Sequence, residues 1–191
     1  MPADVDGDGI TDAVYLDFMD DHAVLGVCTG SGISDSIPSE GQGEVLQIID
    51  VDQDGKDEVF FGGTSIGASI DSIAEFVGGS IVRVRRSDGA PIIVVEGLDP
   101  GILSSHHPAG AAFGCEDVDG DGSPELASVT VSRSDGRFQW RRVDYDIAEG
   151  HASIVSRESG HRRNRPKRRD RDEVVTIAHH LVAACPVKAQ P

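Results

Sequence analysis

The chain has 191 residues, of which 33 are acidic and 17 basic, for a formal net charge of -16, and 38% are hydrophobic, enough to bury a core. A chain this negative is a poor candidate for nucleic-acid binding, because phosphate backbones attract cations. No apolar stretch approaches the roughly 18 residues of a membrane helix, no signal peptide is visible at the start, and three cysteines are too few for a disulfide framework.

The chain opens almost at once on the first of three copies of a nine-residue acidic motif. The copies begin at Asp4, Asp50 and Asp117, and all read D-V-D-x-D-G-x-x-[D/E]. Ca²⁺ is a hard cation that takes six to eight oxygen ligands, and carboxylates at positions 1, 3 and 5 can wrap one ion where the backbone curls tightly. The glycine at position 6 permits that curl because it tolerates positive φ. The carbonyl of position 7 then points inward, and the acid at position 9 closes the cage.

Each motif therefore offers four carboxylates and one backbone carbonyl, and the chain offers up to three Ca²⁺ sites. The predicted carboxylate ligands are Asp4, Asp6, Asp8 and Asp12, then Asp50, Asp52, Asp54 and Glu58, then Asp117, Asp119, Asp121 and Glu125, and the predicted carbonyl ligands are Ile10, Lys56 and Ser123. An acidic surface turn would explain one Asp-Gly pair, but not four acids at fixed offsets in three copies. Mg²⁺ fits less well, since it dehydrates reluctantly and takes fewer protein ligands.

An EF-hand is the obvious alternative, and the sequence argues against it. Position 12 of an EF-hand is a bidentate Glu, whereas here it is Tyr15, Phe61 or Ser128. An EF-hand also needs flanking helices, but the runs after each motif are rich in β-branched and aromatic residues and have strand length. The motif is therefore predicted to join two strands of a β-hairpin.

This pattern resembles the FG-GAP or VCBS-type repeat of the integrin alpha-subunit propeller and of many bacterial surface proteins. Phe113-Gly114 before the third motif looks like the Phe-Gly element of the family, and the segment 58–63 looks like its strand after the loop. The resemblance covers residues 1–157 and implies an all-β fold, a partial β-propeller of four-stranded blades. In such a blade the calcium would rigidify a turn between two strands.

Along the chain, the first interval between motifs is 46 residues, which suits one blade. The second is 67 residues, and within it Ile66, Ile70, Ile73 and Val77 follow a helical spacing, which predicts a short helical insertion over 66–77. Strands are expected at 13–18, 23–27 and 45–49 for the first blade, then at 80–86, 91–95, 126–132 and 137–146.

Three incomplete blades cannot close a propeller, because repeat units bury their faces on neighbours. We therefore expect a chain truncated at its N-terminus, with further blades or domains in the intact protein. Residues 1–157 hold 29 acidic and 9 basic residues, but 158–191 hold 4 acidic and 8 basic. Such a basic run favours a disordered C-terminal extension over 158–191, the alternative being an arm that binds polyanions.

The cysteines and histidines leave two questions open. Cys28 and Cys115 form a disulfide if the protein is extracellular, or else are buried free thiols. His106-His107 has no Cys or His at zinc spacing, so a surface loop is expected there rather than a transition-metal site. No acyl-transfer nucleophile frame and no phosphate-binding glycine motif is found, which argues against an enzyme.

The resemblance implies a non-enzymatic, calcium-stabilised segment of a secreted or cell-surface protein. Its expected role is adhesion or binding of an extracellular protein or carbohydrate ligand, with no nucleic-acid partner and no membrane insertion. Two alternatives remain: a module in which calcium bridges a carbohydrate, and an accessory module of a polysaccharide-acting enzyme.

Overall fold

The computed structural model describes residues 1–19, 22–39, 42–65, 68–89, 92, 110–134, 137–163 and 185. Strands are the only regular elements in these ranges, so the prediction of an all-β chain is confirmed. Within the same ranges, no helix has the length and apolar character that crossing a membrane requires.

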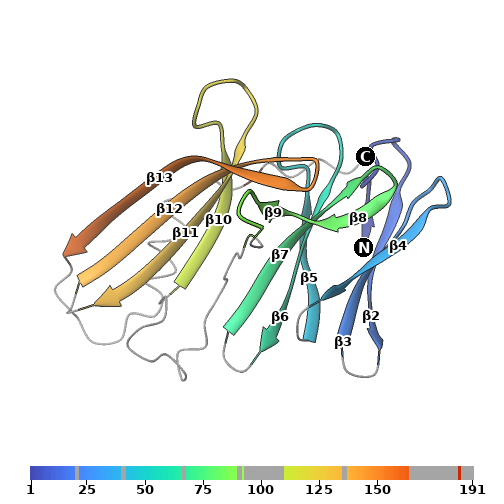
Figure 1. Cartoon of the computed structure of the whole chain (residues 1–191), viewed down its shortest axis with the longest axis horizontal. Helices are drawn as coiled ribbons and strands as arrows, with labels where there is room; N and C mark the ends of the chain where they lie inside the picture. The colour runs from blue at the N-terminus through green and yellow to red at the C-terminus, as the bar shows by residue number, and fades with distance from the viewer. Residues whose placement is uncertain are drawn as a thin grey trace.

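The strands form three sheets, each an antiparallel run of four strands in chain order (Figure 1). The first sheet contains β1 (Pro2–Ala3), β2 (Asp12–Met19), β3 (His22–Cys28) and β4 (Ser34–Ser39). The second contains β5 (Gln42–Ile49), β6 (Glu58–Ser65), β7 (Ala68–Val77) and β8 (Ser80–Arg83). The third contains β10 (Gly110–Glu116), β11 (Glu125–Ser134), β12 (Arg137–Ala148) and β13 (His151–Arg163), and β9 (Arg85–Arg86) pairs with β13 in parallel.

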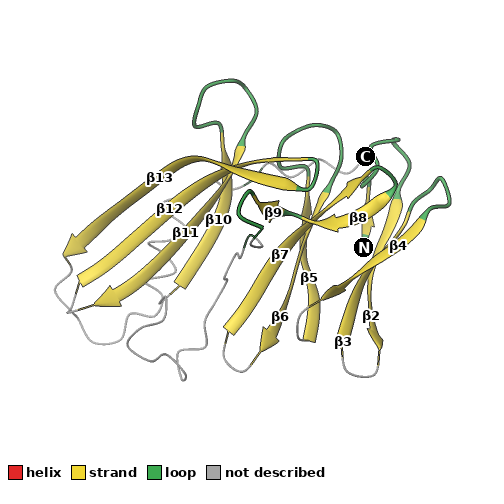
Figure 2. Ribbon diagram, in the orientation of Figure 1, coloured by secondary structure: helices red, strands yellow, loops and turns green. Residues whose placement is uncertain are grey.

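Each acidic motif joins the first and second strands of one sheet, as its flanking residues predict. We call residues 4–12, 50–58 and 117–125 the first, second and third loops. Position 9 of each loop is the first residue of the second strand, and it pairs with the last residue of the first strand; the pairs are Asp12 with Ala3, Glu58 with Ile49, and Glu125 with Glu116. The three loops lie along one edge of the molecule (Figure 2).

The second sheet lies between the other two and contributes to two hydrophobic cores. Phe60 and Ile73 pack with Leu126 and other residues of the third sheet, and the rings of Phe60 and Phe113 stack with centroids 4.8 Å apart. Phe61, which follows Phe60 on β6, packs instead with Leu25 and other residues of the first sheet. Successive residues of a strand point to opposite faces, so β6 has apolar partners on both sides.

Strand β7 is likewise buried on both faces, with Ile73 in one core and Ala74 in the other, and this explains why the predicted helical insertion over 66–77 is wrong. Residues 68–77 form strand β7, paired with β6 so that Ile73 faces Phe60 and Ala74 faces Val59. A strand covered on both faces carries apolar residues at odd and even positions. Some of its apolar residues then fall at spacings of three and four by coincidence, and periodicity alone does not separate such a strand from a helix. Ile66 lies outside the described residues.

The first sheet is completed by a strand that the sequence analysis missed. The segment 45–49 was expected as the third strand of this sheet, but it belongs to β5 and pairs with β6 of the second sheet. β4 takes the expected place beside β3. It was missed because Ile37 is its only large apolar residue and because Pro38 argues against a central strand. An edge position tolerates proline, and β4 is at the edge of the sheet.

Several other expected strands have counterparts in the structure. The segment 80–86 forms β8 and the short β9, and the segments 126–132 and 137–146 lie within the hairpin of β11 and β12. The segment 91–95 lies outside the described residues apart from Ile92, which is buried in the core between the second and third sheets. His106 and His107 also lie outside them.

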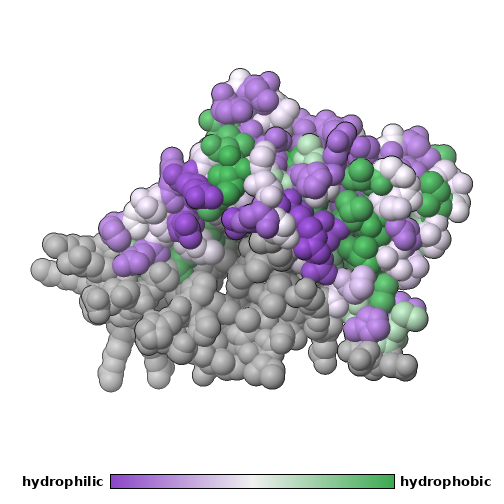
Figure 3. Space-filling view, in the orientation of Figure 1, coloured by the Kyte–Doolittle hydropathy of each residue, from purple (hydrophilic) through white to green (hydrophobic). Residues whose placement is uncertain are grey.

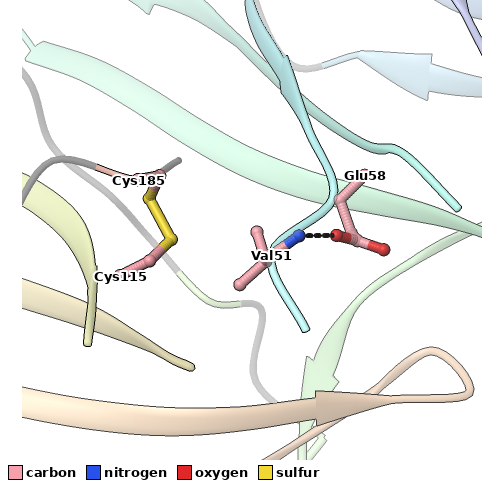
Figure 4. The surroundings of a disulfide bond; sticks show 4 residues. All are labelled: Val51, Glu58, Cys115 and Cys185. Carbon is pink, nitrogen blue, oxygen red and sulfur yellow. Dashed lines mark hydrogen bonds between the residues drawn. A yellow bond between two sulfur atoms is a disulfide. The ribbon is translucent and has the colours of Figure 1, made fainter. Parts of the chain in front are cut away.

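Residues 158–163 take part in the third sheet. Strand β13 continues to Arg163, so the change in composition at residue 158 falls inside a strand. Cys185 forms a disulfide with Cys115 of β10, and both are buried in the core between the second and third sheets (Figure 4). Cys28 is free and exposed at the end of β3. The expected Cys28–Cys115 bond is therefore wrong, because the two residues lie in different sheets. The alternative of two buried free thiols is also wrong, because Cys28 is exposed and Cys115 is bonded to Cys185.

The disulfide is expected to stabilise the fold. It closes a sequence separation of 70 residues, and cross-links of this kind contribute about 2–4 kcal/mol, chiefly by restricting the unfolded chain. Urea unfolding should show a loss of this size for the Cys185→Ala variant and for the reduced protein. Cys28→Ala is the control and should unfold as the unchanged chain does. An unchanged midpoint after reduction would contradict the expected role.

Candidate metal centres

The three loops share one pattern of backbone hydrogen bonds, which positions the same carboxylates in each. The acid at position 9 accepts a hydrogen bond from the N–H of the valine at position 2. The bonds are Val5 to Asp12 at 2.7 Å, Val51 to Glu58 at 2.6 Å (Figure 4), and Val118 to Glu125 at 2.7 Å. This bond links the start of each loop to the first residue of the following strand, so the loop closes on itself.

Further bonds hold the remaining carboxylates in the same way in each copy. The N–H of position 5 donates to the carboxylate of position 3 at 3.1–3.2 Å, and the N–H of position 7 donates to that of position 5 at 2.7–2.8 Å. The N–H of the glycine at position 6 donates to the carboxylate of position 1, as Gly55 does to Asp50 at 3.2 Å. Side chains at positions 1, 3 and 5 are therefore oriented by the loop backbone itself.

Two positions of each loop have a left-handed backbone. Position 6 has φ of 78°, 99° and 97° in the three loops, as the glycine repeated at this position predicts. Position 4 also has positive φ, and here the second loop carries Gln53, with φ 59°, where the others have glycine. The sequence analysis did not single out position 4, although glycine in two of the three copies indicated it.

Carboxylate oxygens from three residues of each loop lie within 4.8 Å of one another, close enough to hold a metal ion. The groups are Asp4, Asp6 and Asp8 in the first loop, Asp50, Asp52 and Glu58 in the second, and Asp117, Asp119 and Glu125 in the third. The first loop thus brings together positions 1, 3 and 5, and the other two bring together positions 1, 3 and 9. The predicted ligands Asp12, Asp54 and Asp121 lie in the same loops but outside these groups.

The residues at position 7, whose carbonyls were predicted as ligands, are Ile10, Lys56 and Ser123. Each donates its backbone N–H to the position-5 carboxylate, and the carbonyl contact to an ion stays a prediction. Lys56 also places its ammonium 2.9 Å from Asp54, and this bond raises the pKa of Lys56. The second loop therefore carries an internal cation that competes for its position-5 carboxylate.

Burial and mutual repulsion make the carboxyl groups of the second loop costly to ionise. Glu58 is only 1% exposed, and loss of hydration together with the nearby Asp52, Glu75 and Asp50 raises its pKa to about 9. Burial, opposed by a hydrogen bond from the Asp54 N–H, raises the pKa of Asp52 to about 6. A divalent cation would reverse this balance, because it favours the ionised carboxylates.

In the third loop the pKa of the position-9 acid is also raised, although the acids at positions 1 and 3 are exposed. Glu125 is buried, and desolvation with the charges of Asp119 and Asp117 raises its pKa. The space-filling view shows hydrophilic residues along the edge where the loops lie (Figure 3). All donors in the three groups are oxygens, with no cysteine or histidine, and this donor set suits a hard divalent cation rather than a soft one.

Glu75 contributes to the electrostatics of the second loop, and the sequence analysis overlooked it. It lies on β7, is buried, and accepts a hydrogen bond from the Gly150 N–H at 2.6 Å. Its charge adds to the repulsion at Asp52 and Glu58. The available signal was an acid within the apolar run 73–77, because a buried acid needs a partner to offset its desolvation.

The first and second loops contact each other directly. The N–H of Asp4 donates to the carboxylate of Asp57 at 2.8 Å, and the N–H of Asp57 donates to the carbonyl of Asp4 at 2.9 Å. A side-chain carbon added at Gly7 would meet the Lys56 side chain at 3.0 Å, so the two loops are closely packed there. Asp57 occupies position 8 of the motif, which sequence reasoning gave no role.

In comparisons with known proteins, no family model, no curated protein and no solved structure matches this chain. The loops themselves form three acidic groups, each able to hold a metal ion, in one repeated hairpin connection of an all-β fold.

Proposed function

We propose that this chain is a non-enzymatic, calcium-binding repeat protein of the FG-GAP or VCBS type, and that its three sheets are blades of a β-propeller. The arrangement of each sheet supports this, since all three contain an antiparallel run of four consecutive strands with the acidic loop between its first and second strands, and the third sheet adds β9 at its edge. The observation that carries the proposal is the repetition of one closed loop geometry with three converging carboxylates in every copy.

The ions are proposed to be structural. The carboxylates of positions 1, 3 and 5 come from the loop, and that of position 9 comes from the second strand of the hairpin. An ion held by both would tie the loop to the strand and neutralise charges that repel one another when it is absent. Bound calcium would supply the positive charge and the oxygen coordination, and the loop backbone would hold the carboxylates ready for it.

Calorimetric titration with calcium tests this proposal directly. Three ions per chain are expected. Replacing Asp119 and Asp121 with Asn should remove one of them, because the amide side chains lack the charge that attracts the ion. Asp146→Asn, an exposed acid of the same sheet, is the matched control and should still bind three. No heat of binding, or binding that is unaffected by the double substitution, would overturn the proposal.

We propose further that the protein is secreted or displayed at a cell surface and has an adhesive role, with an extracellular protein or carbohydrate as its ligand. The Cys115–Cys185 disulfide supports an oxidising location, because disulfides persist in extracellular compartments and are rare in reducing ones. The measurement is thiol labelling of the protein from its native source, before and after reduction. Two additional reactive cysteines without reduction would argue against this location.

One observation favours a second function, in which calcium bridges a carbohydrate in a binding module or an accessory module of a polysaccharide-acting enzyme. Asp8 in the first loop and Asp117 and Asp119 in the third are exposed or nearly so, unlike the buried Asp50 of the second loop. An ion there would be reachable by sugar hydroxyls. A glycan array with and without calcium distinguishes the two, since a purely structural ion would not contact sugar directly.

A further inference from the structure

The contact between the first and second loops is made by residues next to the candidate metal ligands. Asp4 supplies the position-1 carboxylate of the first loop, while its backbone N–H and carbonyl are both bonded to Asp57. Asp57 lies between Lys56 and Glu58, which are positions 7 and 9 of the second loop. One backbone–side-chain bond and one backbone–backbone bond therefore join the ligand-bearing segment of one loop to that of the other.

The second and third loops have no equivalent pair of groups. By the repeat, the partner of Asp50 in the third loop would be position 8, which is Pro124. Proline has no carboxylate to accept a hydrogen bond and no backbone N–H to donate one. The sequence thus rules out this reciprocal contact at the second pair of loops, and the chain contains one linked pair and one pair without the link.

We propose that Asp57 couples the first two metal sites, so that an ion in either loop raises the affinity of the other, while the third loop binds independently. This inference depends on the proposed calcium function. Asp57 is a positioning residue in this scheme, since it acts on the sites through the backbone of Asp4 and through its neighbours in the second loop.

The coupling has a mechanical origin. An ion in the second loop would draw together Asp50, Asp52 and Glu58 and so fix the backbone at Asp57. A fixed Asp57 holds Asp4 in place, and the first loop then loses less conformational freedom when it binds its own ion. Electrostatics act in the opposite direction, because the charge of one ion weakens the attraction for the next. Salt at about 0.15 M ionic strength screens this repulsion in part, less for the buried carboxylates of the second loop, whereas the hydrogen-bonded link is not screened.

The experiment is calcium calorimetry at that ionic strength on the Asp119→Asn, Asp121→Asn chain, in which only the first two loops are intact. Adding Asp52→Asn isolates the first loop, and adding Asp6→Asn isolates the second. The two-site chain should bind the pair of ions at least about fivefold more tightly than the product of the isolated affinities, within the usual range for coupled sites. Such a cycle isolates the interaction between the two loops.

Two substitutions at position 57 sharpen the test. Asp57→Ala removes the acceptor for the Asp4 N–H but keeps the backbone N–H that bonds the Asp4 carbonyl, so the ratio of paired to isolated affinities should fall clearly toward one. Asp57→Asn keeps an oxygen acceptor and should retain most of the coupling. Circular dichroism on each chain verifies that it is folded. A ratio near one in the two-site chain, or a ratio that Asp57→Ala leaves unchanged, overturns the inference, and absence of any binding refutes the calcium proposal itself.

Discussion

Removing calcium with a chelator is expected to lower the melting temperature of this protein by ~15–30 °C relative to millimolar calcium. An ion that binds only the folded state at about a hundred times its dissociation constant stabilises it by about 2.7 kcal/mol. Three such loops would add ~8 kcal/mol, and each kcal/mol shifts the melting of a chain of this length by about 2–4 °C. Scanning calorimetry with and without chelator measures the shift.

The control for this prediction is a chain in which each loop has lost one of its ligand charges. With Asp6, Asp52 and Asp119 all replaced by Asn, melting should respond little to calcium. Mg²⁺ should stabilise the unchanged protein less than calcium does, because it is smaller and demands a stricter octahedral geometry. Equal melting temperatures with and without chelator would show that no loop binds calcium selectively in the folded state.

In chelator, the titration of Glu58 should by itself lower the free energy of unfolding by about 4 kcal/mol between pH 5 and pH 8. The folded protein raises the pKa of Glu58 from 4.5 to about 9, because the carboxyl is buried among Asp50, Asp52 and Glu75. Over this range the unfolded chain releases the Glu58 proton and the folded chain keeps it, so rising pH favours unfolding. The stabilisation is complete below about pH 4.5 and is lost as the pH rises toward 9. Urea unfolding at both pH values gives the difference.

Glu58→Gln is the matched variant for this pH dependence. The amide oxygen can still accept the hydrogen bond from the Val51 N–H, but the group no longer titrates. In chelator the variant should be the more stable protein at pH 8 and should lose most of the dependence on pH. With calcium the order should reverse, because the ion needs the ionised carboxylate. A chelated protein that gains stability between pH 5 and pH 8 would contradict the assignment.

The hairpin connections could be predicted because their signals are local. Glycine at position 6 and acids at fixed offsets indicate a tight loop, and the apolar runs after it indicate strands. The same reasoning failed over 66–77, where a strand is buried on both faces, and at β4, where Ile37 beside Pro38 makes a weak signal. Periodicity alone does not separate a strand from a helix when both faces are buried, and whether both faces are buried depends on the neighbouring sheets.

The candidate ligands could likewise be predicted as sets, but not their individual surroundings. The motif placed all twelve carboxylates in three loops, whereas their burial differs between copies, with Asp50 buried and Asp117 exposed. The roles of Asp57 and Glu75 were not predictable from the motif. Both act on a loop from outside its predicted ligand set, and Glu75 does so from a strand that follows the loop in the chain.

By itself, the sequence determined the three acidic loops and their place between paired strands. The hydrogen bonds that all three loops share join residues two to seven positions apart, such as Val51 and Glu58, so a nine-residue motif contains the groups needed for them. Only the tertiary structure decided that Cys115 pairs with Cys185 and that Asp57 meets Asp4, since these contacts join residues 70 and 53 positions apart. Such contacts depend on how whole sheets pack, and no short motif encodes that packing.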